Sequence, residues 1–338
     1  MDRADKPLAL TLGDPTGIGP DITLLAHQAR MREPIPPFVL LGDPELLAAR
    51  ARALGLATAL EIVGTPGAAS EVFAKALPVL PIGVAGTVVP GHADPAAASA
   101  IQRSIERAVA LVLAGDAGAV VTNPISKAAL YRTGFAFPGH TEFLGQLAGL
   151  KPSDAVMMLV SGDLKVVPVT IHIPLKDVMT ALTPALILQT LMTTVRDLKR
   201  YFGISQPRIA VTGLNPHAGE DGTLGREEID IIAPAIEAAR GKGLDVTGPH
   251  SADALFHAEA RKTYDVAIAM YHDQALIPFK TLAFDTGVNV TLGLPFVRTS
   301  PDHGTAFALA GTGKASPRSL IEALRLADAM RARAGDAP

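Results

Sequence analysis

Short runs of Val, Ile and Leu alternate with longer amphipathic segments along almost the whole chain, and this alternation limits the possible folds more than any other feature of the sequence. Such alternation is typical of βαβ units, in which helices cover a largely parallel sheet. Strands that are buried on both faces are rich in branched aliphatic residues, as these runs are. The sequence therefore predicts an α/β protein.

The predicted elements follow from these two patterns. The strands predicted from apolar runs are Leu8–Leu12, Phe38–Leu41, Ala119–Thr122, Val156–Val160, Lys165–Ile173, Arg208–Thr212, Val266–Met270 and Val288–Leu292. The helices predicted from apolar positions three and four residues apart are Ala96–Leu113, Pro184–Phe202, Glu227–Ala239 and Pro317–Ala334. Residues 64–95 are rich in Ala, Gly and Pro and predict loops around one or two short strands.

Length and composition exclude several classes of protein. A chain of 338 residues suggests about two domains. With 48% hydrophobic and 19% charged residues it is too apolar to be disordered, and a net charge of -3 gives no basic field for nucleic acid or an anionic membrane. The absence of cysteine excludes a thiolate nucleophile, so a metal would need His, Asp or Glu. The N-terminal segment matches no targeting peptide and no apolar run is long enough to span a membrane, so the cytoplasm is the predicted location.

Three of the nine histidines come at or just after the end of separate predicted strands. They are His172, His217 and His272. Ligands of open α/β sheets bind outside the carboxyl ends of the strands, and three imidazoles with an open position suit a divalent metal. A single histidine at a strand end is more often a hydrogen-bonded structural residue. The spacing matches no short metal motif, so the pattern alone leaves both readings open.

Two glycine-rich segments lie near opposite ends of the chain, at residues 12–22 and 302–317. In the first, Gly13 and its neighbours allow a strand to turn sharply into a helix that begins near Pro20. In the second, Gly304, Gly311 and Gly313 would let the backbone approach a flat ligand closely. Tight turns of a compact fold explain the glycines equally well.

The two segments resemble those of the β-decarboxylating dehydrogenases, the isocitrate and isopropylmalate dehydrogenase group, in which the C-terminal loop binds NAD. This resemblance implies two α/β/α domains with the active site in a cleft. Residues 1–125 and 300–338 would form a discontinuous NAD-binding domain, and residues 126–299 would form a domain for substrate, metal and dimerisation. The aspartate metal cluster of that group is missing here, and three histidines take its place.

Six further motifs follow one another along the chain: GHTE at 139–142, TIHIPL at 170–175, GLNPHAGEDG at 213–222, AMYHDQ at 269–274, GVNVTLGLPFVRTS at 287–300 and DHGTA at 302–306. They resemble a closer family, the 4-hydroxythreonine-4-phosphate dehydrogenases of pyridoxal phosphate biosynthesis. The resemblance runs over nearly the whole chain. It implies an oxidoreductase that uses NAD or NADP and one zinc, magnesium or cobalt ion, and a homodimer whose active site is shared between subunits.

The same resemblance assigns roles to individual residues. The implied metal ligands are His172, His217 and His272; the implied substrate-binding residues are His140, Thr141, Lys280, Asn289 and Arg298; and the implied cofactor-binding residues are Gly13, His303, Gly304, Gly311 and Gly313. A helix that opens at Thr141 would present free N–H groups to a phosphate. A lysine and an arginine suit a phosphate and a carboxylate on one small substrate.

The resemblance implies oxidation of 4-phosphooxy-L-threonine at C3, with the resulting 3-oxo acid losing carbon dioxide to give 3-amino-2-oxopropyl phosphate. Candidate general bases are Asp253, Asp273 and Lys280, and Asp273 has the alternative role of orienting a ligand histidine. Around Asp253 the sequence carries Ser251 and Ala254 where the family usually has Pro and Thr, which leaves the local hydrogen bonding open.

Other functions stay open at this stage. Within the family these are dehydrogenases of 4-phospho-D-threonate, of D-erythronate or of aromatic cis-dihydrodiols. Outside it, three histidines and an activated water would suffice for a metal-dependent hydrolase. A dinucleotide-type loop at 302–317 counts against a hydrolase. A phosphate acyltransferase would not need three histidines, and a metal-binding module without catalysis would show no NAD-dependent change.

Overall fold

The computed structural model describes residues 6–126, 140–151 and 154–335, with the side chains of residues 140–142 outside the description. The chain divides into two units. Met1–Pro152 and Leu294–Pro338 form the first, here called the terminal unit, and Ser153–Gly293 forms the second, the inserted unit. The predicted α/β class is confirmed in both. The unit boundaries fall at 152/153 and 293/294, where the sequence predicts 125/126 and 299/300.

The terminal unit contains a parallel sheet in the described residues, with strand order β3-β4-β2-β1-β5-β12. Its strands are β1 (Leu8–Thr11), β2 (Phe38–Gly42), β3 (Leu60–Ile62), β4 (Leu77–Pro81), β5 (Val120–Val121) and β12 (Arg298–Pro301). Its α-helices are α1 (Gly19–Ala29), α2 (Pro44–Ala53), α3 (Ala69–Val72), α4 (Ala98–Leu113), α6 (His140–Leu147) and α11 (Arg318–Gly335). Apart from the edge strand β3, which is largely exposed, the strands are buried almost throughout, which explains their aliphatic composition.

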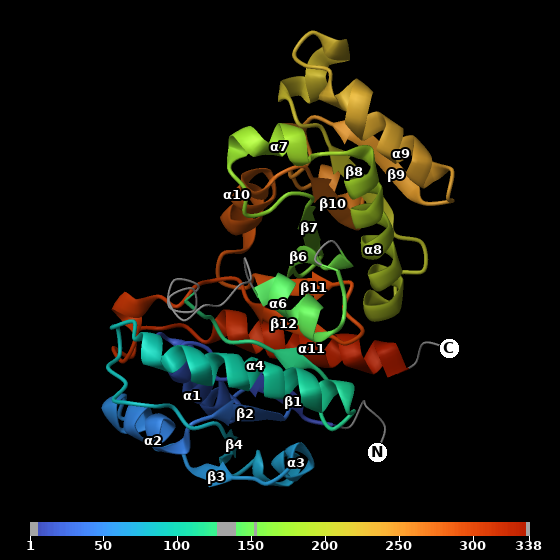
Figure 1. The fold of residues 1–338 in the computed structure, drawn as a ribbon. Helices are drawn as coiled ribbons and strands as arrows, with labels where there is room; N and C mark the ends of the chain where they lie inside the picture. The colour runs from blue at the N-terminus through green and yellow to red at the C-terminus, as the bar shows by residue number, and fades with distance from the viewer. Residues whose placement is uncertain (1–5, 127–139, 152–153, 336–338) are drawn as a thin grey trace. The chain divides into compact units, whose positions relative to one another are not determined.

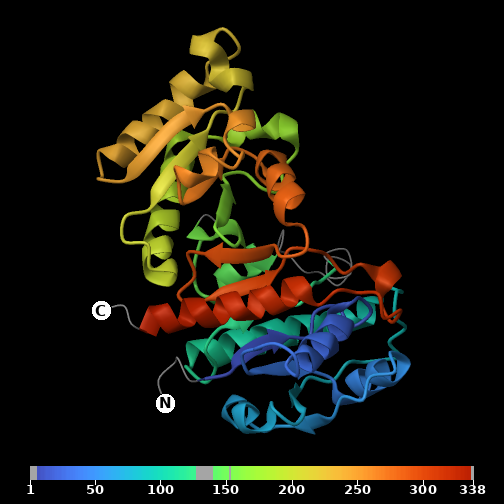
Figure 2. The ribbon, with the colours of Figure 1, turned by 180° about the vertical axis from the view of Figure 1, so that it is seen from behind.

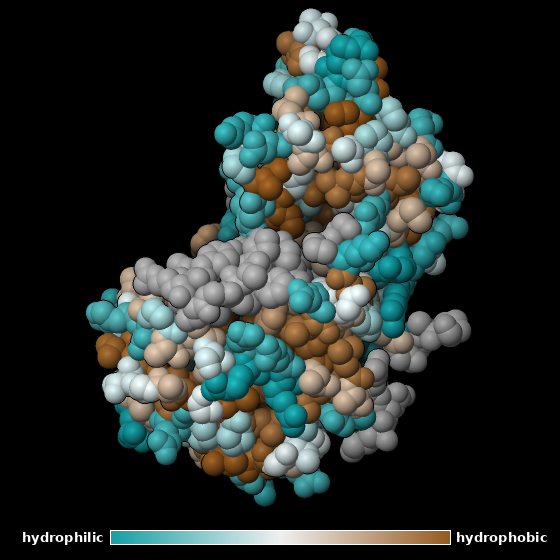
Figure 3. Space-filling model, in the orientation of Figure 1, coloured by the Kyte–Doolittle hydropathy of each residue, from teal (hydrophilic) through white to brown (hydrophobic). Residues whose placement is uncertain are grey.

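Helices cover both faces of this sheet. α3, α4 and α6 contribute to one apolar cluster with β1, β2 and β5, while α1 and α11 lie on the opposite face (Figures 1 and 2). The periodicity of α4 places Ile101, Ile105 and Val112 in that cluster. Its outward face carries the hydrophilic residues that are teal in Figure 3.

The inserted unit has a mixed sheet with strand order β11-β6-β7-β10-β8-β9. Its strands are β6 (Val156–Ser161), β7 (Leu164–Pro168), β8 (Arg208–Thr212), β9 (Asp245–His250), β10 (Val266–Ala269) and β11 (Val288–Leu292). β6 pairs antiparallel with β7 and β11, whereas β7, β10, β8 and β9 are parallel to one another. Because β7, β10 and β8 are parallel neighbours, their carboxyl ends lie at one edge of the sheet.

Helices of the inserted unit surround this sheet. They are α7 (Leu175–Ala181), α8 (Pro184–Phe202), α9 (Ala233–Arg240) and α10 (His272–Ala283), with a single π-helical segment at Glu228–Ile232. α10 packs on β7 and β10 through Leu276 and Phe279, and α8 packs against α9 and contacts β6 and β11. α8 has the bounds that the sequence predicts: Thr183 caps it by accepting from Leu186 N at 3.1 Å, and Gly203 ends it with a φ of 68°.

Two predicted elements need correction. The strand predicted at Lys165–Ile173 ends at Pro168, so His172 lies in the loop beyond the strand. Val169 and Thr170 still donate to the carbonyls of Ala269, the last residue of β10, and of Met270 before the chain turns away toward α7. The helix predicted at Glu227–Ala239 begins with the π-helical segment, and Pro234, which lacks an N–H, opens α9.

Among the described residues, no single helix is long and apolar enough to cross a membrane. α7 and α8 pass that test only as a pair bent by 90°. The cytoplasmic location stays a prediction.

Candidate functional site

The carboxyl ends of three neighbouring strands of the inserted unit lead to the three candidate metal ligands. His172 follows β7, His217 follows β8 and His272 begins α10 directly after β10. Since these strands are adjacent and parallel, the fold delivers all three histidines to the same edge of the sheet. This is the edge at which open α/β sheets bind ligands.

His172 and His272 lie together in a pocket of this unit. Their ring centroids are 5.7 Å apart. The pocket has a volume of about 240 Å³ and is lined by Ile171, His172, Ile173, Leu175, Val178, Tyr271, His272 and Asp273. An apolar wall with a few convergent polar groups is typical of small-molecule sites.

Asp273 fixes the orientation of one of these rings. The Nδ1 atom of His272 lies 2.6 Å from Oδ1 of Asp273, so the ring donates from Nδ1 to the carboxylate. This hydrogen bond leaves Nε2 with its lone pair, which is the form in which an imidazole binds a metal. The contact supports the role of Asp273 as a group that orients a ligand histidine.

His217 stands in a loop with an unusual backbone. Residues 217–221 all have positive φ, and only Gly219 among them is a glycine. Non-glycine residues in this region store strain and persist where the surrounding structure holds them there. Within the described ranges, no three His, Asp or Glu side chains stand close enough to hold one ion together. The structure thus brings the rings of His172 and His272 together, while the three histidines do not form a closed three-ligand group in the described residues.

Asp253 belongs to this same end of the inserted unit. The Ser251 hydroxyl donates to Oδ1 of Asp253 at 2.5 Å and holds the pKa of that carboxyl below its usual range, with a smaller contribution from the nearby His217. Ser251 therefore supplies the hydrogen bond that the sequence left open. The donor chemistry around this edge, three imidazoles with carboxylates beside them, fits a divalent transition metal.

Two residues that the sequence analysis did not single out hold the loops in place. Gln274 accepts from Met270 N at 2.7 Å and from the Thr212 hydroxyl at 2.8 Å, and it donates to Gly213 O at 2.8 Å. It thereby joins the end of β10 to the end of β8. Glu228, which is 3% exposed, binds the first residues of the His217 loop. Gln274 is the last residue of the AMYHDQ motif and Glu228 lies six residues after the GLNPHAGEDG motif, yet a side chain that works through backbone atoms leaves no pattern of its own in one sequence.

Two predicted substrate-binding residues also belong to the inserted unit. Lys280 is half-buried in the last turn of α10. Asn289 lies on β11 between the buried Val288 and Val290, and its Oδ1 atom is buried without a hydrogen-bond partner in the described part of the chain. Such an orphaned acceptor is costly unless a ligand or water satisfies it.

The other predicted substrate-binding residues fall in the terminal unit. Arg298 opens β12 and is 2% exposed; its Nη2 donates to the Thr122 hydroxyl at 2.6 Å, and burial lowers its pKa to about 10. His140 and Thr141 are the first residues of α6, but their side chains lie outside the described residues.

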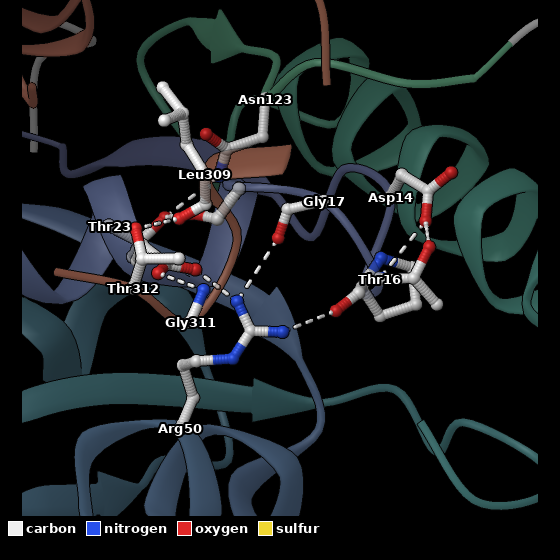
Figure 4. A network of polar contacts seen from close by, with 12 residues as sticks. Asp14, Thr16, Gly17, Thr23, Arg50, Asn123, Leu309, Gly311 and Thr312 are labelled. Atoms are coloured by element: carbon white, nitrogen blue, oxygen red, sulfur yellow. Dashed lines mark hydrogen bonds and ion pairs between the residues drawn. The ribbon is translucent and has the colours of Figure 1, made fainter. Parts of the chain in front are cut away.

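A buried ion pair in the terminal unit ties the two glycine-rich segments together (Figure 4). Arg50 contacts Asp21, and both side chains are almost fully buried. Arg50 also donates to Gly17 O at 3.1 Å and to Pro15 O at 3.0 Å, while Asp21 Oδ1 accepts from Gly311 N at 2.7 Å. One pair of charges thus fixes both candidate cofactor loops.

The predicted cofactor glycines divide into two kinds. Gly13 has a φ of +70°, and a Cβ there would lie 2.5 Å from Cβ of Asn123, so the position admits no side chain. Gly311 is also positive in φ and packs on Pro90. A Cβ at Gly304 would have nothing within 4 Å, and one at Gly313 would meet only a Leu54 methyl at 4.0 Å, so both present open backbone.

His303 borders this open backbone. Its Nδ1 lies 3.1 Å from Gly304 O, and its Nε2 is buried without a partner in the described ranges. A cavity of about 560 Å³ opens beside α2, with Arg50 and Pro90 in its wall. In the terminal unit, the Arg50–Asp21 pair therefore holds the two glycine-rich loops in place. The main chain at Gly304 and Gly313 is accessible, and a cavity lies beside α2.

Comparison with known proteins identifies the family. The model of the family described as pyridoxal phosphate biosynthetic protein PdxA matches residues 34–327. The chain belongs to the PdxA family. It is 57% identical to the 4-hydroxythreonine-4-phosphate dehydrogenase of Methylorubrum extorquens over 99% of this chain and 97% of the relative. The predicted family and the predicted enzyme class, a dehydrogenase, are confirmed.

Solved structures of the PdxA family support the same assignment. The 4-hydroxythreonine-4-phosphate dehydrogenase of Klebsiella pneumoniae superposes with a TM-score of 0.84 at 40% identity, covering 96% of this chain and 99% of that one. A terephthalate 1,2-cis-dihydrodiol dehydrogenase from Burkholderia xenovorans superposes less closely, with a TM-score of 0.63 at 31% identity over 96% of this chain and 98% of that one.

Proposed function

We propose that this protein oxidises 4-phosphooxy-L-threonine at C3 with NAD or NADP, and that the resulting 2-amino-3-oxo-4-phosphooxybutanoate loses carbon dioxide to give 3-amino-2-oxopropyl phosphate, in pyridoxal phosphate biosynthesis. The observation that carries the proposal is the His172–His272 pair with Asp273 at the ends of parallel strands. The chain that holds this pair is 57% identical to a relative named 4-hydroxythreonine-4-phosphate dehydrogenase. Bound NAD or NADP would supply the acceptor for the C3 hydride, and a base of this chain would take the hydroxyl proton.

The metal ligands in this proposal are His172, His217 and His272. A bound divalent ion supplies Lewis acidity, which favours ionisation of the C3 hydroxyl and stabilises the negative charge left when carbon dioxide departs. Three imidazoles favour zinc or cobalt over magnesium, which prefers oxygen ligands. Asp273 is engaged by His272 and Asp253 accepts from Ser251, so Asp253, Asp273 and Lys280 are all retained as candidates for the base.

The substrate would be held by His140, Thr141, Lys280, Asn289 and Arg298. The unpartnered Oδ1 of Asn289 supports a role in accepting a donor from the substrate, such as its ammonium group. The buried Arg298 keeps its charge, because a pKa of about 10 lies far above neutrality.

The cofactor would lie on the glycine loops of the terminal unit, on Gly13, His303, Gly304, Gly311 and Gly313. The open backbone at Gly304 and Gly313 supports this placement, because a dinucleotide needs close approach to the main chain. NAD and NADP are both retained as candidates.

A homodimer is part of the proposal, with an active site shared between subunits. Large apolar side chains are exposed on and beside α7 and α10, and Leu175 among them also lines the histidine pocket. They are Leu175 at 68%, Met179 at 45%, Ile277 at 64%, Leu282 at 49% and Phe284 at 74%. Exposed apolar side chains gathered in one region are typical of subunit interfaces.

A second candidate function is a cis-dihydrodiol dehydrogenase, which the 31% identical structure favours. The phosphothreonine-type substrate is preferred because the relatives of that name are more similar, at 57% and 40% identity. Oxidation of 4-phospho-D-threonate or D-erythronate stays an alternative. Assays with the L-amino acid and the D-acids distinguish these substrates.

The test is NADH formation by the purified protein with 4-phosphooxy-L-threonine and 4-phospho-D-threonate in parallel, each with and without a chelator. We expect a chelator-sensitive signal with the L-amino acid alone. His217→Ala should abolish both stoichiometric metal and turnover, whereas His92→Ala, an exposed histidine of the terminal unit, should change neither. Full turnover by metal-free protein would contradict the metal role, and a signal with the D-acid alone would contradict the substrate.

A further inference from the structure

Glu228 is a buried carboxylate in the inserted unit for which the proposed reaction has no use. It is 3% exposed and begins the π-helical segment Glu228–Ile232. π-helical turns are rare and are frequent at functional sites. A buried charge of this kind is costly unless it is fully hydrogen-bonded.

The hydrogen bonds of Glu228 all run to the start of the loop that bears His217. Its Oε1 accepts from Leu214 N at 2.7 Å and from Asn215 N at 2.8 Å, and its Oε2 accepts from Nδ2 of Asn215 at 3.0 Å. Burial alone would raise the pKa of this carboxyl, but the hydrogen bonds from Asn215 and Leu214 outweigh burial and lower it. The carboxylate is therefore ionised, and both of its oxygens accept hydrogen bonds from the loop.

The same carboxylate also shapes the middle of the loop. A Cβ at Gly219 would lie 2.5 Å from Oε2 of Glu228, and one at Gly213 would lie 2.9 Å from Oε1. The loop thus folds around the carboxylate with no space for side chains at these two glycines. Between them lie His217 and Ala218, with φ values of 51° and 52°.

A left-handed run of non-glycine residues persists only where neighbouring groups hold it. Glu228 is a buried group that accepts hydrogen bonds from the loop before His217 and packs closely against Gly219 after it. We propose that Glu228 is a positioning residue for His217: it holds the strained loop in the conformation from which this histidine reaches a divalent metal. The inference rests on the proposed function, because it presumes that His217 is a metal ligand.

The experiment measures zinc and cobalt binding by the purified, metal-stripped protein, by calorimetry and by the visible absorption of bound cobalt, without substrate or turnover. Glu228→Gln keeps the side-chain shape but removes the charge, and its NH2 must face a donor, either Nδ2 of Asn215 or the backbone N–H groups of Leu214 and Asn215. We expect the affinity for either metal to fall by about 10–100-fold, as is typical when a group supporting a ligand is changed. The cobalt spectrum should change as well.

Two comparison variants separate this role from a loss of charge. Glu237→Gln removes an exposed carboxylate that pairs with Arg240 on α9 of the same unit, and it should leave metal affinity unchanged. Glu227→Gln removes an acceptor that bonds only the Asn215 side chain, at 2.6 Å, and it should have a smaller effect than Glu228→Gln.

Gly219→Ala provides a second route to the same disturbance if Glu228→Gln does not fold. Its new Cβ would push the loop away from an intact Glu228 and should lower metal affinity to a similar degree. Wild-type metal affinity in a folded Glu228→Gln or Gly219→Ala protein would overturn the inference. Failure of the wild-type protein to bind metal would instead overturn the proposed function, so the two failures are distinguishable.

Discussion

The terminal and inserted units each use one buried carboxylate to hold a loop, but they neutralise its charge differently. Asp21 accepts from the backbone of Gly311 and is paired with the guanidinium of Arg50. Glu228 accepts from the backbone of Leu214 and Asn215 and is held by neutral N–H donors alone. Asp21 joins distant segments, with one partner at Arg50 and another at Gly311, whereas Glu228 acts on a loop only 13 to 14 residues away in the chain. The first arrangement makes a rigid frame, and the second holds a short, strained segment in place.

Arg50→Met should have the largest effect, because it leaves the carboxylate of Asp21 buried without its counter-charge. Removing one partner of a buried pair costs about 3–5 kcal/mol in the free energy of unfolding. The measurement is urea unfolding, with Arg52→Met, an exposed arginine of the same helix, as the control.

A double-mutant cycle sharpens this result. Asp21→Asn in the Arg50→Met background should recover part of the lost stability, because the unpaired charge is gone while an acceptor for Gly311 N remains. A loss below about 1 kcal/mol for Arg50→Met would mean that the pair behaves like a surface salt bridge and that the contrast with Glu228 is wrong.

Acid should weaken the terminal unit before the inserted unit. His27 is fully buried in α1; burial lowers its pKa to about 4, with its Nε2–H donating to Phe73 O and Nδ1 accepting from Arg30. Above pH 6.5, the pKa in the unfolded chain, His27 is neutral in both the folded and the unfolded protein, so the free energy of unfolding has its full value. As the pH falls from 6.5 to 4 the unfolded chain takes up a proton that the folded chain refuses, so stability is lost by about 3 kcal/mol.

Amide hydrogen exchange between pH 7.5 and 4.5 reads this effect in each unit separately. His27→Gln, which does not titrate, should flatten the pH dependence of protection in the terminal unit. Because the pKa of Glu228 is lowered, this carboxylate stays ionised over the same pH range and continues to hold the His217 loop. Equal loss of protection in both units of the wild-type protein would contradict the prediction.

The smallest effect is expected from Asp273→Asn in the inserted unit. An asparagine oxygen can still accept from Nδ1 of His272, but without the charge, so metal affinity should fall by about 10-fold. Calorimetric zinc titration checks it, with Asp163→Asn, a turn residue between β6 and β7, as the control. An affinity loss larger than that of Glu228→Gln would show that ring orientation matters more than loop position.

The sequence predicted elements whose signals are local. α8 and β8 were predicted with their observed bounds, because Thr183 and Gly203 mark the helix ends and β8 is a buried aliphatic run. β9 and β12 escaped prediction: the first contains Gly248 and Pro249, and the second begins at Arg298, so neither reads as an apolar strand.

The candidate site shows the same division. The histidines could be brought together from the sequence because strand ends of a parallel sheet share an edge. The roles of Arg50, Glu228 and Gln274 could not, since each acts on backbone groups of segments whose proximity only the fold creates. The strand predicted to reach His172 was too long, because the alternation of apolar residues continues past Pro168 after the pairing geometry has changed.

The division of the chain into units also determines which unit can be completed first during synthesis. β12 and α11 complete the terminal unit, yet the ribosome makes them after the whole of Ser153–Gly293. β1, β2, β4 and β5 therefore emerge early and wait for Arg298–Pro301 and for the segment that supplies Gly311 to Asp21. The inserted unit is contiguous and has all its strands available sooner. During translation the loop that carries His217 can thus take shape while the carboxylate of Asp21 still lacks its last backbone partner.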